Sequence, residues 1–277
     1  MHRLLLAGLV FVTAADRTSD REALLAADRA LSDRTASLGF VQGFVPAMSS
    51  TAAYLYPGAP LLRGIDKVRA YFQNGDSIAR MTWSPAFADV SADGELGYSY
   101  GWTQSGNARG KYLACWRKAQ GDWRIVAYAT NRPIVVTDSV PAWTHGEKLG
   151  RQVGGRADAG ELMHADSAFA ALSLAQGAKA AFLAYAADDG MSFGGGAQFT
   201  EGRQAIGAGF DGFPPGAVLA WWPVSAEIAK SGDLGCTVGE ATIASLHHFS
   251  KYLTVWKRQQ DGSWKFVADG GNARPAP

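Results

Sequence analysis

Two stretches of the chain carry apolar residues at the spacing of a helical face. In both stretches these residues lie three, four or seven positions apart: Leu24, Ala27, Leu31 and Leu38 in the first, and Leu162, Ala165, Phe169 and Leu172 in the second. A capping box formed by Ser19 and Glu22 precedes the first stretch. The spacing predicts a helix near the start of each half of the chain.

Each predicted helix is followed by shorter helices and then by strands. Short helices are expected around residues 40–45 and 179–186, and again after Gly64 and Gly202. The predicted strands of the two halves are 81–90, 111–118 and 123–129, and 219–229, 251–258 and 264–269. Helices followed by hairpin-connected strands indicate an α+β fold, with helices on one face of a curved antiparallel sheet.

The two halves are copies of one domain. Shifting the chain by 138 positions places residues 81–101 on residues 219–239 without a gap. Identical residues that meet include Trp83 and Trp221, Pro85 and Pro223, Gly94 and Gly232, Leu96 and Leu234, Gly97 and Gly235, and Gly101 and Gly239. A period this long indicates duplicated domains rather than a solenoid. We expect domains at 16–137 and 155–277, joined by a linker at 138–154.

Three short motifs of the strands resemble a known superfamily; the last two occur in both halves, and the first occurs in the second half, where the first half has the similar GELGYSYG. They are GDLG-x-T-x-G, KYL-x-x-W followed by two basic residues, and G-x-W-[KR]-x-V-A. This pattern is similar to that of nuclear-transport-factor-2-like domains, and especially of the SnoaL-like domains of unknown function. The resemblance implies a cone in which a bent sheet wraps helices around a pocket. It also implies pairing through the sheets, so that a tandem copy forms an intramolecular pseudo-dimer; further homo-oligomers are left open.

Composition and charge narrow the function classes. The chain has 277 residues, of which 47% are hydrophobic, and its 26 basic residues nearly balance its 25 acidic ones. That balance gives no net positive charge of the kind that binds nucleic acid. No run reaches the roughly 18 apolar residues of a membrane span. Residues 1–15 have the form of a signal peptide, which predicts a periplasmic or secreted protein, the alternative being an ordinary first helix. Cys115 and Cys236 lie in apolar runs and are expected to be two free buried thiols.

Strand alternation suggests one candidate base. Leu234, Cys236, Val238 and Glu240 share a face, and because the first three are apolar, Glu240 is expected to point into the pocket near its rim. The alternative is a shifted register that leaves Glu240 in solvent. The matching face of the first domain is aromatic and is expected to line a ligand cavity or to pack structurally; its residues are Tyr98, Tyr100 and Trp102.

Four further ionisable residues of the second domain are candidates for acid–base chemistry: Asp166, His247, His248 and Asp269. Asp166 lies beside the apolar stripe of its helix, from which it reaches either the pocket or the helix surface. The adjacent histidines face opposite ways in a strand, so that one faces the pocket mouth, unless both are hairpin residues without a role. Asp269 ends the last strand, where the first domain has Tyr128.

Two aromatic residues, Tyr252 and Trp221, are candidate substrate contacts, although packing explains them equally well because both have counterparts in the first domain. No metal site is predicted, since the chain has no C-x-x-C or paired-histidine ligand spacing. These residues favour a cofactor-independent lyase or isomerase that acts on a small apolar or aromatic molecule. The alternative is a non-catalytic ligand-binding or association protein, because no strict catalytic motif is present and a fold does not determine a function.

Overall fold

The computed structural model describes residues 14–73, 81–135 and 154–277. Residues 138–153 of the predicted linker at 138–154 and residues 1–13 of the predicted signal peptide lie outside this range, so the domain boundaries and the signal peptide stay predictions. Within the described residues, no helix is long and apolar enough to cross a membrane.

The first domain consists of two α-helices and a seven-stranded sheet. Its elements are helix α1 (Ala14–Gly39), a π-helical turn (Phe40–Phe44), a 3-10 turn (Val45–Ala47), β1 (Met48–Leu55), β2 (Leu62–Arg63), α2 (Ile65–Phe72), β3 (Thr82–Val90), β4 (Leu96–Ser105), β5 (Ala108–Ala119), β6 (Asp122–Thr130) and β7 (Ile134–Val135). The strand order is β2-β1-β6-β5-β4-β3, with β7 paired to β5.

The second domain repeats this arrangement. Its elements are α3 (Ala159–Gln176), α4 (Ala178–Tyr185), β8 (Ala186–Ser192), β9 (Thr200–Glu201), α5 (Arg203–Ala208), β10 (Ala220–Ile228), β11 (Leu234–Ile243), a 3-10 turn (Ala244–Leu246), β12 (His248–Arg258) and β13 (Trp264–Ala273). The order β10-β11-β12-β13-β8-β9 mirrors that of the first sheet. The predicted α+β fold is confirmed, with one addition: β1 and β8, which the pattern did not predict, pair in parallel with β6 and β13.

The register explains why Pro and Gly recur in both copies. Pro85 and Pro223 lie on the edge strands β3 and β10, opposite Gly101 and Gly239, and each proline begins a register shift. A proline is tolerated at such a bulge on an edge strand because no central ladder bond is lost. A Cβ on Gly101 would lie 2.0 Å from the Ser84 carbonyl oxygen, so this close approach requires glycine.

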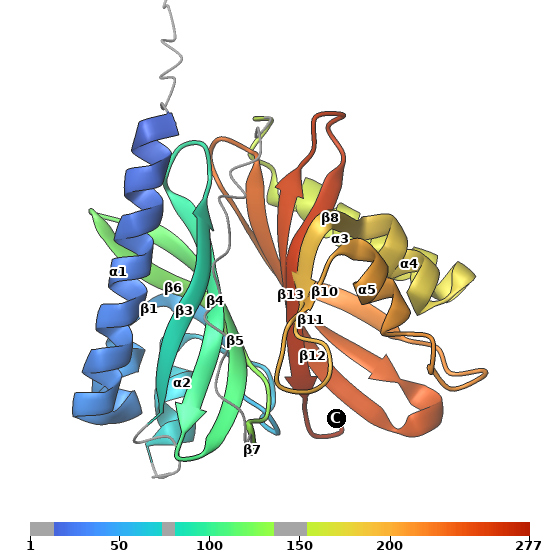
Figure 1. The fold of residues 1–277 in the computed structure, drawn as a ribbon, viewed down its shortest axis with the longest axis horizontal. Coiled ribbons are helices and arrows are strands. Elements are labelled where there is room, and N and C mark those ends of the chain that lie inside the picture. Colours follow the sequence, from blue (N-terminus) through green and yellow to red (C-terminus); the bar gives the residue numbers. More distant parts are fainter. Residues whose placement is uncertain (1–13, 74–80, 136–153) are drawn as a thin grey trace, which may run out of the picture.

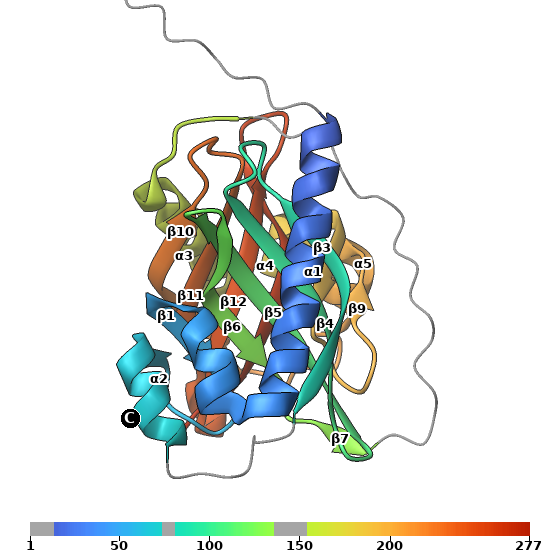
Figure 2. The ribbon, with the colours of Figure 1, turned by 90° about the vertical axis from the view of Figure 1, so that its left-hand side faces the viewer.

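The two sheets pack face to face, with the helices on the outer faces (Figure 1). Seen from the side, α1 lies across the first sheet and the second sheet lies behind it (Figure 2). The residues of both sheets that meet between the domains form one buried cluster, which includes Tyr98, Tyr100, Cys236 and Val238. Each sheet is therefore buried on both faces, once against its own helices and once against the other domain.

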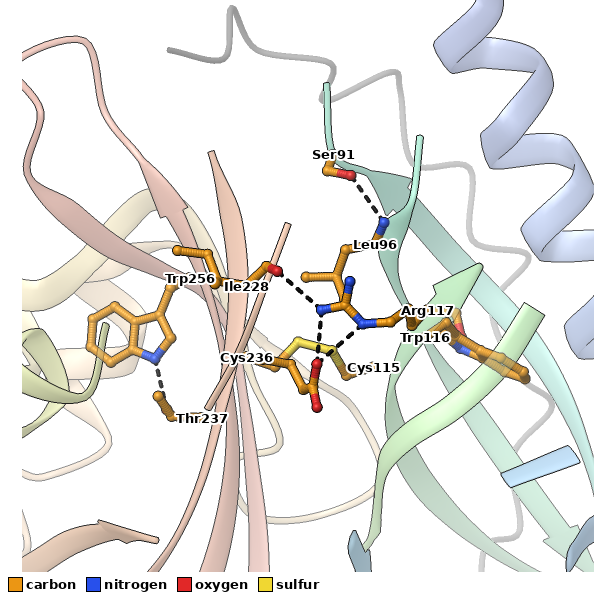
Figure 3. The surroundings of a disulfide bond; sticks show 11 residues. Ser91, Leu96, Cys115, Trp116, Arg117, Ile228, Cys236, Thr237 and Trp256 are labelled. Atoms are coloured by element: carbon orange, nitrogen blue, oxygen red, sulfur yellow. Dashed lines mark hydrogen bonds and ion pairs between the residues drawn. A yellow bond between two sulfur atoms is a disulfide. The ribbon is translucent and has the colours of Figure 1, made fainter. Parts of the chain in front are cut away.

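A disulfide bond joins the two sheets near the centre of this interface (Figure 3). It links Cys115 of β5 to Cys236 of β11, so the expectation of two free thiols is wrong. The two cysteines lie on the facing sides of the two sheets, a juxtaposition that their separation of 121 residues does not reveal. Beside the bond, the Arg117 side chain donates to Glu227 at 2.8 Å and to the Ile228 carbonyl at 3.0 Å.

Candidate functional site

A pocket of about 410 Å³ lies in the second domain, between the sheet and its helices. Phe169 of α3, Phe182 of α4 and Trp221 of β10 form an aromatic wall, in which the rings of Phe169 and Trp221 are 4.5 Å apart. Alternate residues of β12 face the pocket from the sheet; these are His248, Ser250, Tyr252 and Thr254. The volume lies within the range of about 300–1,000 Å³ that small-molecule sites occupy.

Asp269 of β13 is the carboxyl group on this wall, among the described residues that line it. Its Oδ1 accepts a hydrogen bond of 2.6 Å from the Thr254 hydroxyl, from the opposite position on β12. Burial raises the pKa of Asp269 to about 6, and the charge of Asp166 adds to this, while the Thr254 hydrogen bond lowers it. The side chain is only partly exposed, so an apolar ligand in the pocket would desolvate it further.

Asp166 lies behind this wall and is fully buried. Its carboxylate accepts a hydrogen bond of 3.0 Å from the Trp221 indole and bonds of 3.1 and 3.2 Å from the Tyr252 hydroxyl. Burial raises the pKa of Asp166 to about 6. Burial and then the Asp166 charge raise the pKa of Tyr252 far above its ordinary value, so its hydroxyl keeps its proton.

The first domain carries the same triad. Asp28 accepts hydrogen bonds of 2.6 Å from both the Trp83 indole and the Tyr112 hydroxyl. There, however, the space that corresponds to the pocket is filled by aromatic rings. Tyr128, the counterpart of Asp269, stacks on Tyr112 at 5.4 Å and on Tyr54 at 5.7 Å. Because the triad is kept where the pocket is filled, its common role is to fix the tryptophan and tyrosine against the helix.

The two domains carry different residues around the pocket of the second domain. Three tyrosines of the first domain, Tyr54, Tyr56 and Tyr128, match Ser192, Gly194 and Asp269, and Phe40 matches Ala178. Each change removes a ring from the interior. The Asp269 partner Thr254 likewise matches Ala114. Neither Thr254 nor the aromatic residues Phe169 and Phe182 were predicted as site residues, although this comparison of the copies is the signal that points to Thr254.

The structure brings together some of the predicted site residues and separates others. Asp269, His248, Tyr252 and Trp221 line the pocket, with Asp166 directly behind. His247 is exposed in the turn before β12, in a left-handed conformation with φ 48°, and is not among the lining residues.

Glu240 lies on the opposite face of the sheet from the pocket. It shares that face with Cys236 and Val238, and its carboxylate forms an ion pair of 3.2 Å with Arg274. The expectation that this face lines the pocket is wrong, because the apolar face of β11 packs against the first domain. Tyr98, Tyr100 and Trp102 belong to the same interface cluster, which corrects their prediction as a ligand cavity.

One cation also borders the pocket. Lys251 of β12 is buried, and its ammonium donates to the Asn272 side-chain oxygen at 2.5 Å and to the Ala273 carbonyl at 3.0 Å. Burial, followed by the nearby Arg274 charge, lowers its pKa to about 8. No group of three or more His, Cys, Asp and Glu side chains suited to a metal ion occurs in the described part of the chain.

Comparisons with known proteins give similarity at the level of the fold. No protein-family model matches the chain, and no curated protein matches its sequence. Similar solved structures include a ketosteroid isomerase-like protein from Erwinia carotovora atroseptica (14% identity, TM-score 0.35, 42% of this chain and 96% of that one). Another is an NTF2-like protein of unknown function from Pseudomonas putida (17% identity, TM-score 0.35, 43% of this chain and 87% of that one). A third is a putative calcium/calmodulin-dependent protein kinase II association domain from Xanthomonas campestris (17% identity, TM-score 0.35, 42% of this chain and 88% of that one).

Each of these alignments covers less than half of this chain and most of the other one. By its own element order, each half of the chain is an α+β domain in which helices are followed by a sheet whose first strand pairs in parallel with the last long one. The chain is a tandem pair of such domains.

Proposed function

We propose that this protein is an exported, cofactor-independent enzyme of the lyase or isomerase type. It acts on a small apolar or aromatic molecule held in the pocket of the second domain, and Asp269 is its general base. The observation that carries the proposal is the position of this carboxyl group, on a pocket wall beside three aromatic rings, with its pKa raised to about 6. General bases work best when their pKa lies near the working pH.

The geometry suits removal of a proton from a carbon acid. With a pKa of about 6, Asp269 is mostly ionised at neutral pH, yet it is a stronger base than an exposed carboxylate. Thr254 occupies Oδ1, which leaves Oδ2 to take the proton from a ligand that stacks on the aromatic wall. The electron pair of the broken C–H bond then forms a double bond. The proton returns at another carbon in an isomerase, and a leaving group departs with its electrons in a lyase.

Asp166 and Tyr252 are positioning residues in this scheme. The Tyr252 hydroxyl donates a hydrogen bond to Asp166 and is therefore engaged with that carboxylate rather than available as an acid. The fixed indole of Trp221 completes the wall against which a ring is held.

Turnover of a panel of aryl ketones, aryl alcohols and enones tests the proposal. We expect Asp269→Asn to abolish turnover while the ligand still binds, and kcat/KM of the wild type to fall as the pH drops below about 6, where the base is protonated. Glu240→Gln is the matched control and should leave turnover unchanged, because Glu240 lies on the other face of the sheet. Full activity of Asp269→Asn would refute the role of Asp269.

The second candidate function is ligand binding without catalysis. It is favoured by the fact that Asp269 is the one carboxyl group among the described lining residues, with no second acid beside it. In that case ligands raise the melting temperature of the wild type and of Asp269→Asn alike, and no probe turns over.

Export is supported by two independent features. Residues 1–15 have the form of a signal peptide, and the Cys115–Cys236 disulfide is typical of proteins that fold in an oxidising compartment. Mass spectrometry of the protein from fractionated cells tests this, since we expect a mature chain that begins at Asp16 outside the cytoplasm. An uncleaved chain in the cytoplasm would contradict it.

A further inference from the structure

A second pocket, of about 380 Å³, adjoins the first on the other side of Asp269. Three residues line both pockets: Phe182, Asp269 and Gly271. The proposed base therefore lies at the junction of two spaces, each large enough for a ligand group.

The two pockets differ in chemistry. The second pocket also has rings on its wall, from Phe182, Phe193 and Phe210. Unlike the first, however, it has five glycines among its twelve described lining residues, and it carries two hydroxyl side chains, Ser192 and Thr200. Apart from Asp269, no charged side chain is among the described residues that line the second pocket. Such a wall offers hydrogen bonds to an uncharged polar group and no partner for an anion.

The duplicated domain shows why the second pocket is open. Ser192 and Gly194 stand where the first domain has Tyr54 and Tyr56, whose rings are stacked 6.4 Å apart. Gly194 also has a φ of +54°, and a Cβ there would lie 2.0 Å from the Thr200 hydroxyl oxygen. The space thus depends on residues that lack a large side chain, and the loop that carries Gly194 adopts a conformation that disfavours one.

The wall of the second pocket is held in place by the first domain. The ammonium of Lys111, a fully buried residue of β5, donates to the Phe193 carbonyl and, at 2.8 Å, to the Gln198 carbonyl. The Trp102 indole donates to the Ala197 carbonyl at 3.2 Å. These bonds cross the domain interface and fix the glycine-rich loop between β8 and β9, so the second pocket is formed before a ligand arrives.

We infer that the substrate is an elongated aryl compound with an uncharged, hydrogen-bonding side chain, which spans both pockets. Its ring lies against Phe169 and Trp221, its side chain extends past Asp269 toward Ser192 and Thr200, and the carbon that joins them lies at the carboxylate. The span of the ligand rests on the two pockets alone. Only the reaction at the joining carbon rests on the proposed function.

Isothermal titration calorimetry with three probes tests the span. We expect 3-phenyl-1-propanol, which has a ring and a neutral hydroxyl tail, to bind at least tenfold more tightly than phenol or 3-phenylpropionate. Ser192→Tyr introduces the residue that the first domain has at this position. It should reduce the affinity for 3-phenyl-1-propanol to that for phenol and leave phenol binding unchanged. Ser192→Ala removes the hydroxyl without filling the space; it should weaken the binding of 3-phenyl-1-propanol less than Ser192→Tyr does and leave phenol binding unchanged.

Equal affinity of the wild type for phenol and 3-phenyl-1-propanol would overturn the inference, as would an equal loss of affinity for both probes in Ser192→Tyr.

NMR of the wild-type protein with labelled methyl groups gives an independent test. Contacts are expected from the probe ring to Ala241 in the first pocket and from its tail to Ile206 in the second. Contacts to Ala241 alone would refute the span. Binding across both pockets without turnover of any arylalkyl probe would refute the proposed catalysis and leave the span intact.

Discussion

Replacing Asp269 by Asn should stabilise the second domain at neutral and alkaline pH. In the folded protein the pKa of Asp269 is raised from 3.8 to about 6, chiefly because the carboxylate is removed from water. A raised folded pKa means that the folded state binds the proton more tightly than the unfolded state does. The stabilisation by that proton is complete below about pH 4 and is lost as the pH rises through about 6. An asparagine has no proton to lose and escapes this penalty.

The size of the effect follows from the shift. A change of about two pKa units corresponds to about 3 kcal/mol, at 1.36 kcal/mol per unit. Because the side chain is partly exposed to the pocket, solvent screens some of this, and we expect a gain of about 1–3 kcal/mol at pH 8. At pH 4 the carboxyl group is largely neutral, and the two proteins should differ much less. The expected loss of activity in the same variant makes this a trade of stability for function.

Urea unfolding of both proteins at pH 4, 6 and 8, followed by tryptophan fluorescence, measures the difference. Asp66→Asn, a change at a carboxylate that is 91% exposed, is the control for the loss of a surface charge. The reasoning fails if the gain from Asp269→Asn is the same at pH 4 and pH 8, or if the variant is less stable than the wild type at pH 8.

Three further predictions concern the interface and the filled domain. Changing Cys115 and Cys236 together to Ser should lower the free energy of unfolding by about 2–4 kcal/mol, measured by urea titration, and no loss would show that the bond does not constrain the chain. Lys111→Met should speed amide exchange in the loop 193–198 by about 10- to 150-fold, since bonds to a charged donor contribute about 1.5–3 kcal/mol, and unchanged exchange would show that the ammonium does not hold the loop. Tyr128→Ala should destabilise the first domain by about 3–5 kcal/mol in the same titration without altering ligand binding in the second, whereas weaker ligand binding would contradict the separation of the two interiors.

Much of the fold was predictable because duplication repeats each local signal twice. The matched glycines, prolines and tryptophans mark bulges, close approaches and helix contacts that both copies need. Gly97 and Gly235, for example, lie where a Cβ would be 2.7 and 2.5 Å from the leucines of the packed helices. Strands β1 and β8 were missed because their hydrogen bonds come from parallel partners far along the chain, and no local hairpin signal marks them.

The site was predictable only in part. Asp269 and His248 line the pocket, although strand alternation predicted only that one of the two adjacent histidines faces it, while Glu240 was placed on the wrong face. Alternation identifies residues that share a face of a strand, and in most sheets the apolar face is the one that meets the helices. Here both faces are apolar, because the second domain supplies a cover for the first.

The sequence by itself determined that this protein is a duplicated α+β chain, since an internal repeat and hydrophobic periodicity are properties of residue order. It also contained the difference between the copies, with tyrosines in one interior and Ser192, Gly194 and Asp269 in the other. Only the tertiary structure decided which face of each sheet holds the pocket, that Cys115 and Cys236 meet, and that Lys111 reaches the loop of the other domain. These features depend on contacts between two sheets whose residues lie more than a hundred positions apart in the sequence. Local patterns of a few residues carry no information about such long-range contacts.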